Sequence, residues 1–171
     1  LETFRLPTMD HRSVVAAAEG DARGMEHIAA GVTAGRGVVA VLPHSGNWDV
    51  AGLMLASEYG SLTTVAERLR PESLYRRFVE YRESLGMEIL PLTGGATSTS
   101  SVLKERLRAG GIVCLLGDRD LTASGVPVTF FGERTRMPAG PAMLAALTGA
   151  DLVVAHLSFS QTGGRAGWRT R

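Results

Sequence analysis

The sequence has a single cysteine, Cys114, among 171 residues. A lone cysteine excludes a disulfide framework and a cysteine-based zinc site within this chain. It lies inside the apolar stretch GIVCLL, and an unpaired thiol there favours a reducing compartment.

Long apolar runs are also missing. No stretch approaches the roughly 18 residues that a transmembrane helix needs, and the first residues lack the charged, apolar and small-residue order of a signal peptide. We therefore expect these residues to form a soluble or peripheral protein. The chain starts at Leu1 and stops at GWRTR directly after an expected strand, so we expect one domain over residues 1–171 that is truncated at both ends.

Neither sign of charge is in clear excess. The chain has 18 Lys and Arg residues against 17 Asp and Glu residues, for a formal net charge of +1. Overall electrostatics therefore indicate no nucleic-acid partner, and any basic surface must be local. Hydrophobic residues make up 44% and charged residues 20%, which is typical of a globular protein.

Short apolar or β-branched runs alternate with helical patterns. This order predicts an α/β fold with a twisted, mostly parallel central sheet flanked by helices. The expected strands are residues 37–43, 62–67, 87–92, 112–117, 126–131 and 151–159. The expected helices are residues 13–34, 47–59, 72–85, 98–109 and 138–148.

An ionisable residue follows three of the expected strands: His44, Glu67 and Asp118. Helical crossovers make these strands parallel. The carboxyl ends of parallel strands lie at one edge of the sheet, where sites of open α/β folds form. We therefore expect the three side chains to gather at one rim.

The stretch VLPHSGNWDV places His44 after an apolar run and Asp49 five positions later. A neutral imidazole can accept a proton from a hydroxyl near neutral pH if a carboxylate holds its other nitrogen. On one continuous helix the two side chains would point roughly 140° apart, so His44 must lie in the loop before the helix to meet Asp49. Pro43 can close the strand and Asn47 can cap the helix, which favours that placement. The alternative is that His44 and Asp49 only cap and hydrogen-bond this turn.

Two other enzyme classes fit these residues less well. Ser45 does not lie in a G-x-S-x-G elbow, which disfavours a serine hydrolase. A metal hydrolase would need ligands beside His44, Asp49 and Asp118, and the other histidines show no ligand spacing. We therefore predict no metal site.

Three blocks follow one another in the chain: PHSGNWD, VAERLRPESLYRRFVEYRESLGMEILPL and GDRDLTASGVPVTFFGERTRMPAGPAMLA. Together they resemble the glycerolipid and lipid A acyltransferase superfamily, in particular the branch of lauroyl-type acyltransferases and actinobacterial phosphatidylinositol mannoside acyltransferases. The resemblance runs from about Gly37 to about Leu157, and the middle block is most similar to the mannoside enzymes. It implies a glycerol-3-phosphate acyltransferase-like fold.

The resemblance implies transfer of a long acyl chain from a thioester to a sugar or glycerol hydroxyl, without a covalent acyl-enzyme. His44 would be the general base for the acceptor hydroxyl. In the mannoside enzymes an acidic residue after the fourth strand pairs with this histidine, and Asp118 in LLGDRD stands at that place. Asp49 would support the loop or share the task. No resident cofactor is implied, because acyl-CoA is a donor substrate.

The resemblance also implies residues that bind substrate. Glu67, Arg68 and Arg82 fall in the block most similar to the mannoside enzymes. An arginine can bind the inositol phosphate bidentately, and Glu67 can accept hydrogen bonds from sugar hydroxyls or orient Arg82. Arg119 and Arg134 fall in the block that helps to bind the acceptor or the thioester. For Arg82 the plainer alternative is one more charge on an amphipathic helix.

The implied enzyme acylates a mannose hydroxyl of a phosphatidylinositol mannoside and is peripheral to the cytoplasmic face of the inner membrane. The stretch from Arg68 to Arg82 holds five arginines, counting both ends, and these could attract anionic headgroups, although nearby glutamates dilute them. Two alternatives stay open. One is a different glycolipid acceptor, such as a lipid A precursor, and the other is a non-catalytic lipid-binding domain.

Overall fold

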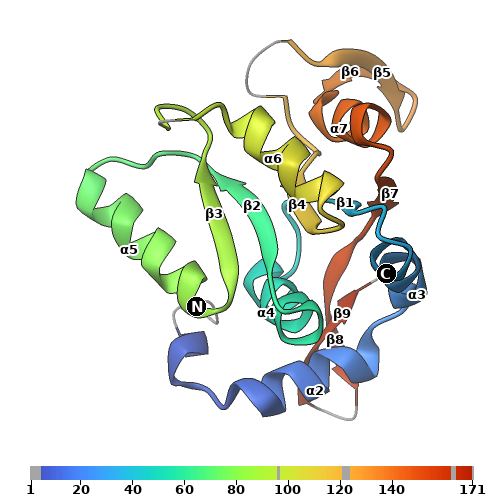
Figure 1. The fold of residues 1–171 in the computed structure, drawn as a ribbon. Coiled ribbons are helices and arrows are strands. Elements are labelled where there is room, and N and C mark those ends of the chain that lie inside the picture. The colour runs from blue at the N-terminus through green and yellow to red at the C-terminus, as the bar shows by residue number, and fades with distance from the viewer. Residues whose placement is uncertain (1–4, 96, 121–123, 163–164, 171) are drawn as a thin grey trace.

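A parallel sheet of five strands forms the centre of the computed structural model, in the order β3-β2-β4-β1-β7 (Figure 1). All four neighbouring pairs in this sheet are parallel. The strands are β1 (Val38–Leu42), β2 (Leu62–Ala66), β3 (Met87–Pro91), β4 (Ile112–Leu116) and β7 (Asp151–Val154). The structure describes residues 5–95, 97–120, 124–162 and 165–170.

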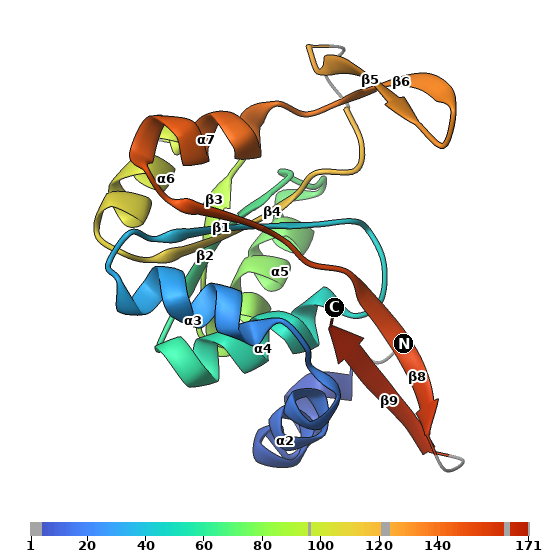
Figure 2. The ribbon, with the colours of Figure 1, turned by 90° about the vertical axis from the view of Figure 1, so that its right-hand side faces the viewer.

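Helices cover both faces of the sheet, so the expected α/β fold is confirmed (Figure 2). One face carries α3 (Met25–Thr33), α4 (Trp48–Tyr59) and α5 (Glu72–Ser84), and the other carries α6 (Thr99–Arg108) and α7 (Gly140–Thr148). A 3₁₀ turn (Leu6–Thr8) and α2 (His11–Asp21) precede α3, and α2 packs on the outside of α4. None of the helices in the described ranges is both long and apolar enough to cross a bilayer.

Alternation along β1 supplies both halves of the core. Val38 packs in the cluster under α3 and α4, whereas Val39 packs in the cluster under α6 and α7. A strand buried on both faces needs apolar residues at successive positions, which explains the run GVVAVLP. The end of the Met87 side chain occupies the space where Gly52 has no Cβ, so α4 packs directly against β3 at this position.

The expected helix over residues 13–34 is two helices, α2 and α3. Gly24 lies between them in the left-handed conformation, with φ 77°, and begins the second helix. The sequence pattern looked continuous because both helices bury apolar residues in the same cluster, including Val14 and Ile28.

Two antiparallel ribbons differ from the expected sheet. β5 (Val126–Phe130) pairs with β6 (Glu133–Met137) outside the central sheet, and the expected strand 151–159 divides into β7 and β8 (Leu157–Thr162), which pairs with β9 (Arg165–Thr170). Composition predicts that VPVTFF is extended, but it does not identify the neighbouring strand. β6 was not expected, because its charged sequence ERTRM lacks a strand-like apolar face.

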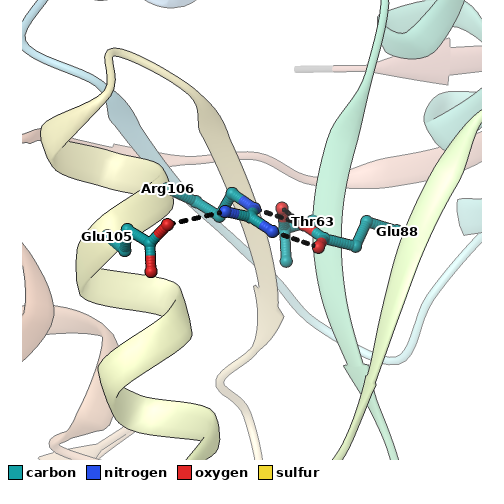
Figure 3. Close-up of polar contacts among 4 residues, drawn as sticks. All are labelled: Thr63, Glu88, Glu105 and Arg106. Atoms are coloured by element: carbon teal, nitrogen blue, oxygen red, sulfur yellow. Dashed lines mark hydrogen bonds and ion pairs between the residues drawn. The ribbon is translucent and has the colours of Figure 1, made fainter.

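A polar clasp joins α6 to β2 and β3 (Figure 3). Arg106 donates from Nε and Nη2 to the two carboxylate oxygens of Glu88, at 2.8 and 2.7 Å, and the Thr63 hydroxyl donates to Glu88 at 2.7 Å. The hydrogen bonds from Arg106 hold the pKa of Glu88 below its usual range. Glu105 accepts from the same guanidinium at 3.2 Å, from a more exposed position.

We predict that Glu88→Gln lowers the free energy of unfolding by about 1 kcal/mol, because at this partly exposed pair the hydrogen bonds from Arg106 lose their charge assistance and one of their two acceptor oxygens. Thermal unfolding should show a Tm lower by about 2–4 °C per kcal/mol. Glu105→Gln is the matched control and should leave Tm unchanged.

The effect of Glu88→Gln should depend on pH. Because the folded-state pKa of Glu88 is lowered, its contribution is complete above the unfolded pKa of about 4.3 and is lost as pH falls through the folded value. The difference in Tm between wild type and variant should therefore shrink below about pH 4. A difference that stays constant into acid would contradict the role of the ion pair.

Candidate active site

The pairing of β1 with β4 brings His44 and Asp118 together. Leu42 lies opposite Leu116, and the Gly117 N–H donates to the Leu42 carbonyl at 3.0 Å. His44 and Asp118 each follow two positions after this pair, so they emerge side by side at the carboxyl edge. His44 Nδ1 lies 2.6 Å from Asp118 Oδ1, and the His44 backbone N–H donates to Asp118 Oδ2 at 3.1 Å.

The carboxylate fixes where the proton of the imidazole lies. Burial raises the pKa of Asp118, but hydrogen bonds from the His44 ring and backbone outweigh this effect and hold the pKa below its usual range. Asp118 is therefore ionised near neutral pH and can only accept. Nδ1 of His44 donates to Asp118, which leaves the lone pair of the neutral ring on Nε2. The His44 side chain is 37% exposed, so solvent reaches the ring.

A helix cap and two contacts with Leu157 fix the loop that carries His44. Asn47 caps α4 through its side chain, and the Ser45 hydroxyl donates to the Leu157 carbonyl at 2.9 Å. Gly46 has φ 62°, and a Cβ there would lie 2.7 Å from the backbone carbonyl carbon of Leu157. Only glycine fits this position, for both reasons. His44 thus lies in the loop before the helix.

Asp49 is not bonded to the histidine. It is 2% exposed on the first turn of α4, and Arg82 Nε donates to its Oδ1 at 3.0 Å. The guanidinium of Arg82 lies 5.1 Å from the centroid of the Trp48 ring, and that ring lies 5.6 Å from the His44 ring. The carboxylate that holds Arg82 is therefore Asp49, not Glu67.

The other candidate binding residues are spread along and beyond the carboxyl edge. Glu67 follows β2, the neighbour of β4, and is exposed without a hydrogen-bond or ion-pair partner among the residues described. Arg68 donates two bonds to Glu72, at 2.9 and 3.0 Å. Arg119 is exposed in the turn after β4, and Arg134 is exposed on β6, in the ribbon that projects from the sheet (Figure 2).

Trp48 and Tyr81 were not among the expected site residues. Trp48 lies between the imidazole and Arg82. Within the described part of the chain, the Tyr81 hydroxyl and Asp49 Oδ2 are buried without a hydrogen-bond partner. Burial, and then the charge of Asp49, raise the pKa of Tyr81. The sequence signals Trp48 and Tyr81 only by position, since each directly precedes one member of the Asp49–Arg82 ion pair.

Neither a reactive thiolate nor a metal cluster is found in the described residues. Burial raises the pKa of Cys114 to about 12, so its thiol is protonated near neutral pH. In the ranges that the structure describes, no three His, Cys, Asp or Glu side chains lie close enough to hold a metal ion.

Comparison with known proteins identifies relatives that cover nearly all of this chain. Residues 1–170 match the family described as bacterial lipid A biosynthesis acyltransferase. The chain belongs to this family. The resemblance read from the three sequence blocks is thereby confirmed.

Two curated relatives align with most of this chain. The chain is 56% identical over 162 residues to a protein of Mycobacterium tuberculosis (strain CDC 1551 / Oshkosh) named phosphatidylinositol mannoside acyltransferase. It is 58% identical over 162 residues to a protein of that name from Mycolicibacterium smegmatis (strain ATCC 700084 / mc(2)155). The alignments cover 95% of this chain but 51% and 53% of the relatives, so the chain spans about half the length of the curated relatives it matches.

We predict that Asp49→Asn lowers the free energy of unfolding by about 3–5 kcal/mol, because it leaves a largely buried guanidinium without its counter-charge. Asp118→Asn is the matched control, since the same substitution falls on a carboxylate that is 31% exposed, and it should cost less stability. Denaturant unfolding measures both free energies.

The double variant Asp49→Leu/Arg82→Met should lose less free energy of unfolding than the sum of the losses in its two single variants. Additive losses would contradict a coupled pair.

Proposed function

We propose that this chain carries the catalytic residues of a membrane-associated acyltransferase. The reaction would transfer a long acyl chain from acyl-CoA to a mannose hydroxyl of a phosphatidylinositol mannoside. The observation that carries this proposal is the His44–Asp118 pair, a solvent-reachable imidazole whose Nδ1 is held by an ionised carboxylate. The names of the two relatives support the choice of acceptor.

In the proposed reaction, the acceptor hydroxyl hydrogen-bonds to His44 Nε2. Its oxygen attacks the carbonyl carbon of the thioester while its proton moves to Nε2. The carbon–sulfur bond of the tetrahedral intermediate then breaks, and the imidazolium returns the proton to the leaving sulfur. The products are the acyl ester and free CoA. Asp118 holds the Nδ1–H and stabilises the imidazolium between the two proton transfers.

The acceptor would lie along the carboxyl edge. Glu67 is offered as the residue that accepts hydrogen bonds from sugar hydroxyls, because its carboxylate is exposed one strand away from Asp118. The terminal nitrogens of Arg82 have no hydrogen-bond partner among the described residues and would bind the lipid phosphate. Arg68, Arg119 and Arg134 are offered as further contacts to phosphate groups of the acceptor or of CoA. No resident cofactor or metal enters this scheme.

A lipid acceptor requires the enzyme to work at a bilayer. We propose a peripheral protein at the cytoplasmic face of the inner membrane, where acyl-CoA is available. The acceptor could also be a lipid A precursor, which the description of the matching family favours.

We predict that His44→Gln abolishes CoA release from palmitoyl-CoA in the presence of acceptor, because glutamine cannot take the proton. Asp118→Asn should lower kcat by about 10²–10⁴-fold, the usual contribution of a supported general base. His27→Gln, at an exposed histidine on α3, is the matched control and should keep wild-type turnover. Thiol detection of free CoA measures all three. Unchanged turnover in His44→Gln would end the general-base assignment.

We predict faster CoA release with a phosphatidylinositol mannoside than with a lipid A precursor, when each is offered with palmitoyl-CoA. Mass spectrometry should then find the acyl chain on mannose. A faster reaction with the lipid A precursor would transfer the proposal to that acceptor. Lipid binding without CoA release from either mixture would indicate a non-catalytic lipid-binding domain.

A further inference from the structure

The β5–β6 ribbon projects from the carboxyl edge of the sheet. It follows β4, whose end carries Asp118, and the chain then returns to α7 (Figure 2). No residue of either strand is buried. A ribbon of two strands is marginally stable by itself, so a partner outside the described chain is the natural source of further contacts.

Strand pairing gives the ribbon two unlike faces. One face carries the apolar side chains of Val126, Val128, Phe130 and Met137 together with Thr135 and, at the tip, Glu133. The opposite face carries Arg134 and Arg136, paired with Thr129 and Pro127. A mostly apolar face backed by arginines would suit an element at a membrane interface, by analogy with interfacial amphipathic helices.

The turn at the tip of the ribbon places an aromatic residue in a backbone conformation that such residues rarely adopt. Phe131 has φ 52° and Gly132 has φ 87°, as in a type I′ turn, where asparagine followed by glycine is favoured. The left-handed conformation is unfavourable for a bulky side chain. Phe131 is also 92% exposed, and its described ring contact is an edge-to-face pair with the half-exposed Phe130, at 4.5 Å between centroids. Neither backbone preference nor burial within the described chain accounts for an aromatic residue here.

We infer that the tip of the β5–β6 ribbon inserts Phe130 and Phe131 into the headgroup region of an anionic lipid bilayer, while Arg134 and Arg136 contact headgroup phosphates. Aromatic rings favour this region, and arginine is attracted to anionic lipid. The negative charge of Glu133 offsets part of the positive charge of the two arginines. The apolar contact of the two rings therefore supplies the larger part of the binding free energy, and added salt should weaken vesicle binding only modestly. The inference rests on the proposed function in one respect, the membrane lipid as acceptor.

Three of the five arginines of and before α5 are less suited to this contact, because each already lies near a carboxylate of the chain. Arg68 is bonded to Glu72, Arg82 to the buried Asp49, and Arg76 lies 3.9 Å from Glu72. Docking through the ribbon would instead bring the edge with His44 and Asp118 toward the lipid, because the ribbon projects from that edge of the sheet (Figure 2).

The decisive variant is Phe131→Asn, which removes the ring but supplies the residue that a type I′ turn prefers. Co-sedimentation with mixed phosphatidylcholine–phosphatidylglycerol vesicles should weaken about tenfold. Thermal unfolding should show that Tm is not lowered, so loss of binding cannot be ascribed to unfolding. Leu92→Asn, at a 53% exposed residue outside the ribbon, is the matched control and should bind like wild type.

Two further variants test the geometry. Phe131→Trp should show blue-shifted emission and quenching by brominated lipid, in excess of the signal of wild type. Arg136→Gln should weaken binding to the mixed vesicles more than Arg77→Gln on α5, and neither should alter binding to pure phosphatidylcholine.

Vesicle binding by Phe131→Asn equal to that of wild type would overturn the inference. A change in oligomeric state without a change in vesicle binding would also overturn it and would indicate an interface between copies of this chain. Phe131→Asn should still release CoA when both substrates are in detergent micelles. If wild type binds vesicles through the ribbon but releases no CoA, the proposed function fails and the membrane contact stands.

Discussion

The in-register parallel pairing of β1 with β4 is the constraint on which the site depends. Because Leu42 lies opposite Leu116, two residues that are 74 positions apart in the sequence end up sharing two hydrogen bonds. The sheet does not merely support this pair. Its register determines which carboxylate the imidazole meets, because the strand on the other side of β1 is β7, which is followed by Ala155 and His156 rather than by an acidic residue.

The structure separates the two aspartates by task. Asp118 is partly exposed and bound to the imidazole, whereas Asp49 is buried and bound to Arg82. Arg82 in turn lies against Trp48, which stands beside the imidazole. One carboxylate therefore acts on the charge of the ring, and the other fixes the surroundings of the ring through a guanidinium and an indole.

The sequence predicted the sheet well because buried parallel strands read as continuous apolar runs, and because each run ended at a turn. It also predicted that His44, Glu67 and Asp118 lie at one edge of the sheet, since the carboxyl ends of parallel strands lie at the same edge. It could not choose between Asp49 and Asp118 as the partner of His44 from spacing, because that choice depends on strand order. The division of residues 13–34 into two helices, and the placement of VPVTFF outside the sheet, likewise depend on tertiary partners that local patterns do not encode.

Close contacts fix the length of the loop between β1 and α4. Gly46 packs against the backbone of Leu157, the Ser45 hydroxyl is hydrogen-bonded to the carbonyl of the same residue, and Asn47 caps α4. A one-residue insertion or deletion would turn the imidazole away from the carboxylate and would also break these ties. In this segment, divergence among related chains should therefore proceed by exchange of side chains, with the number of residues held constant.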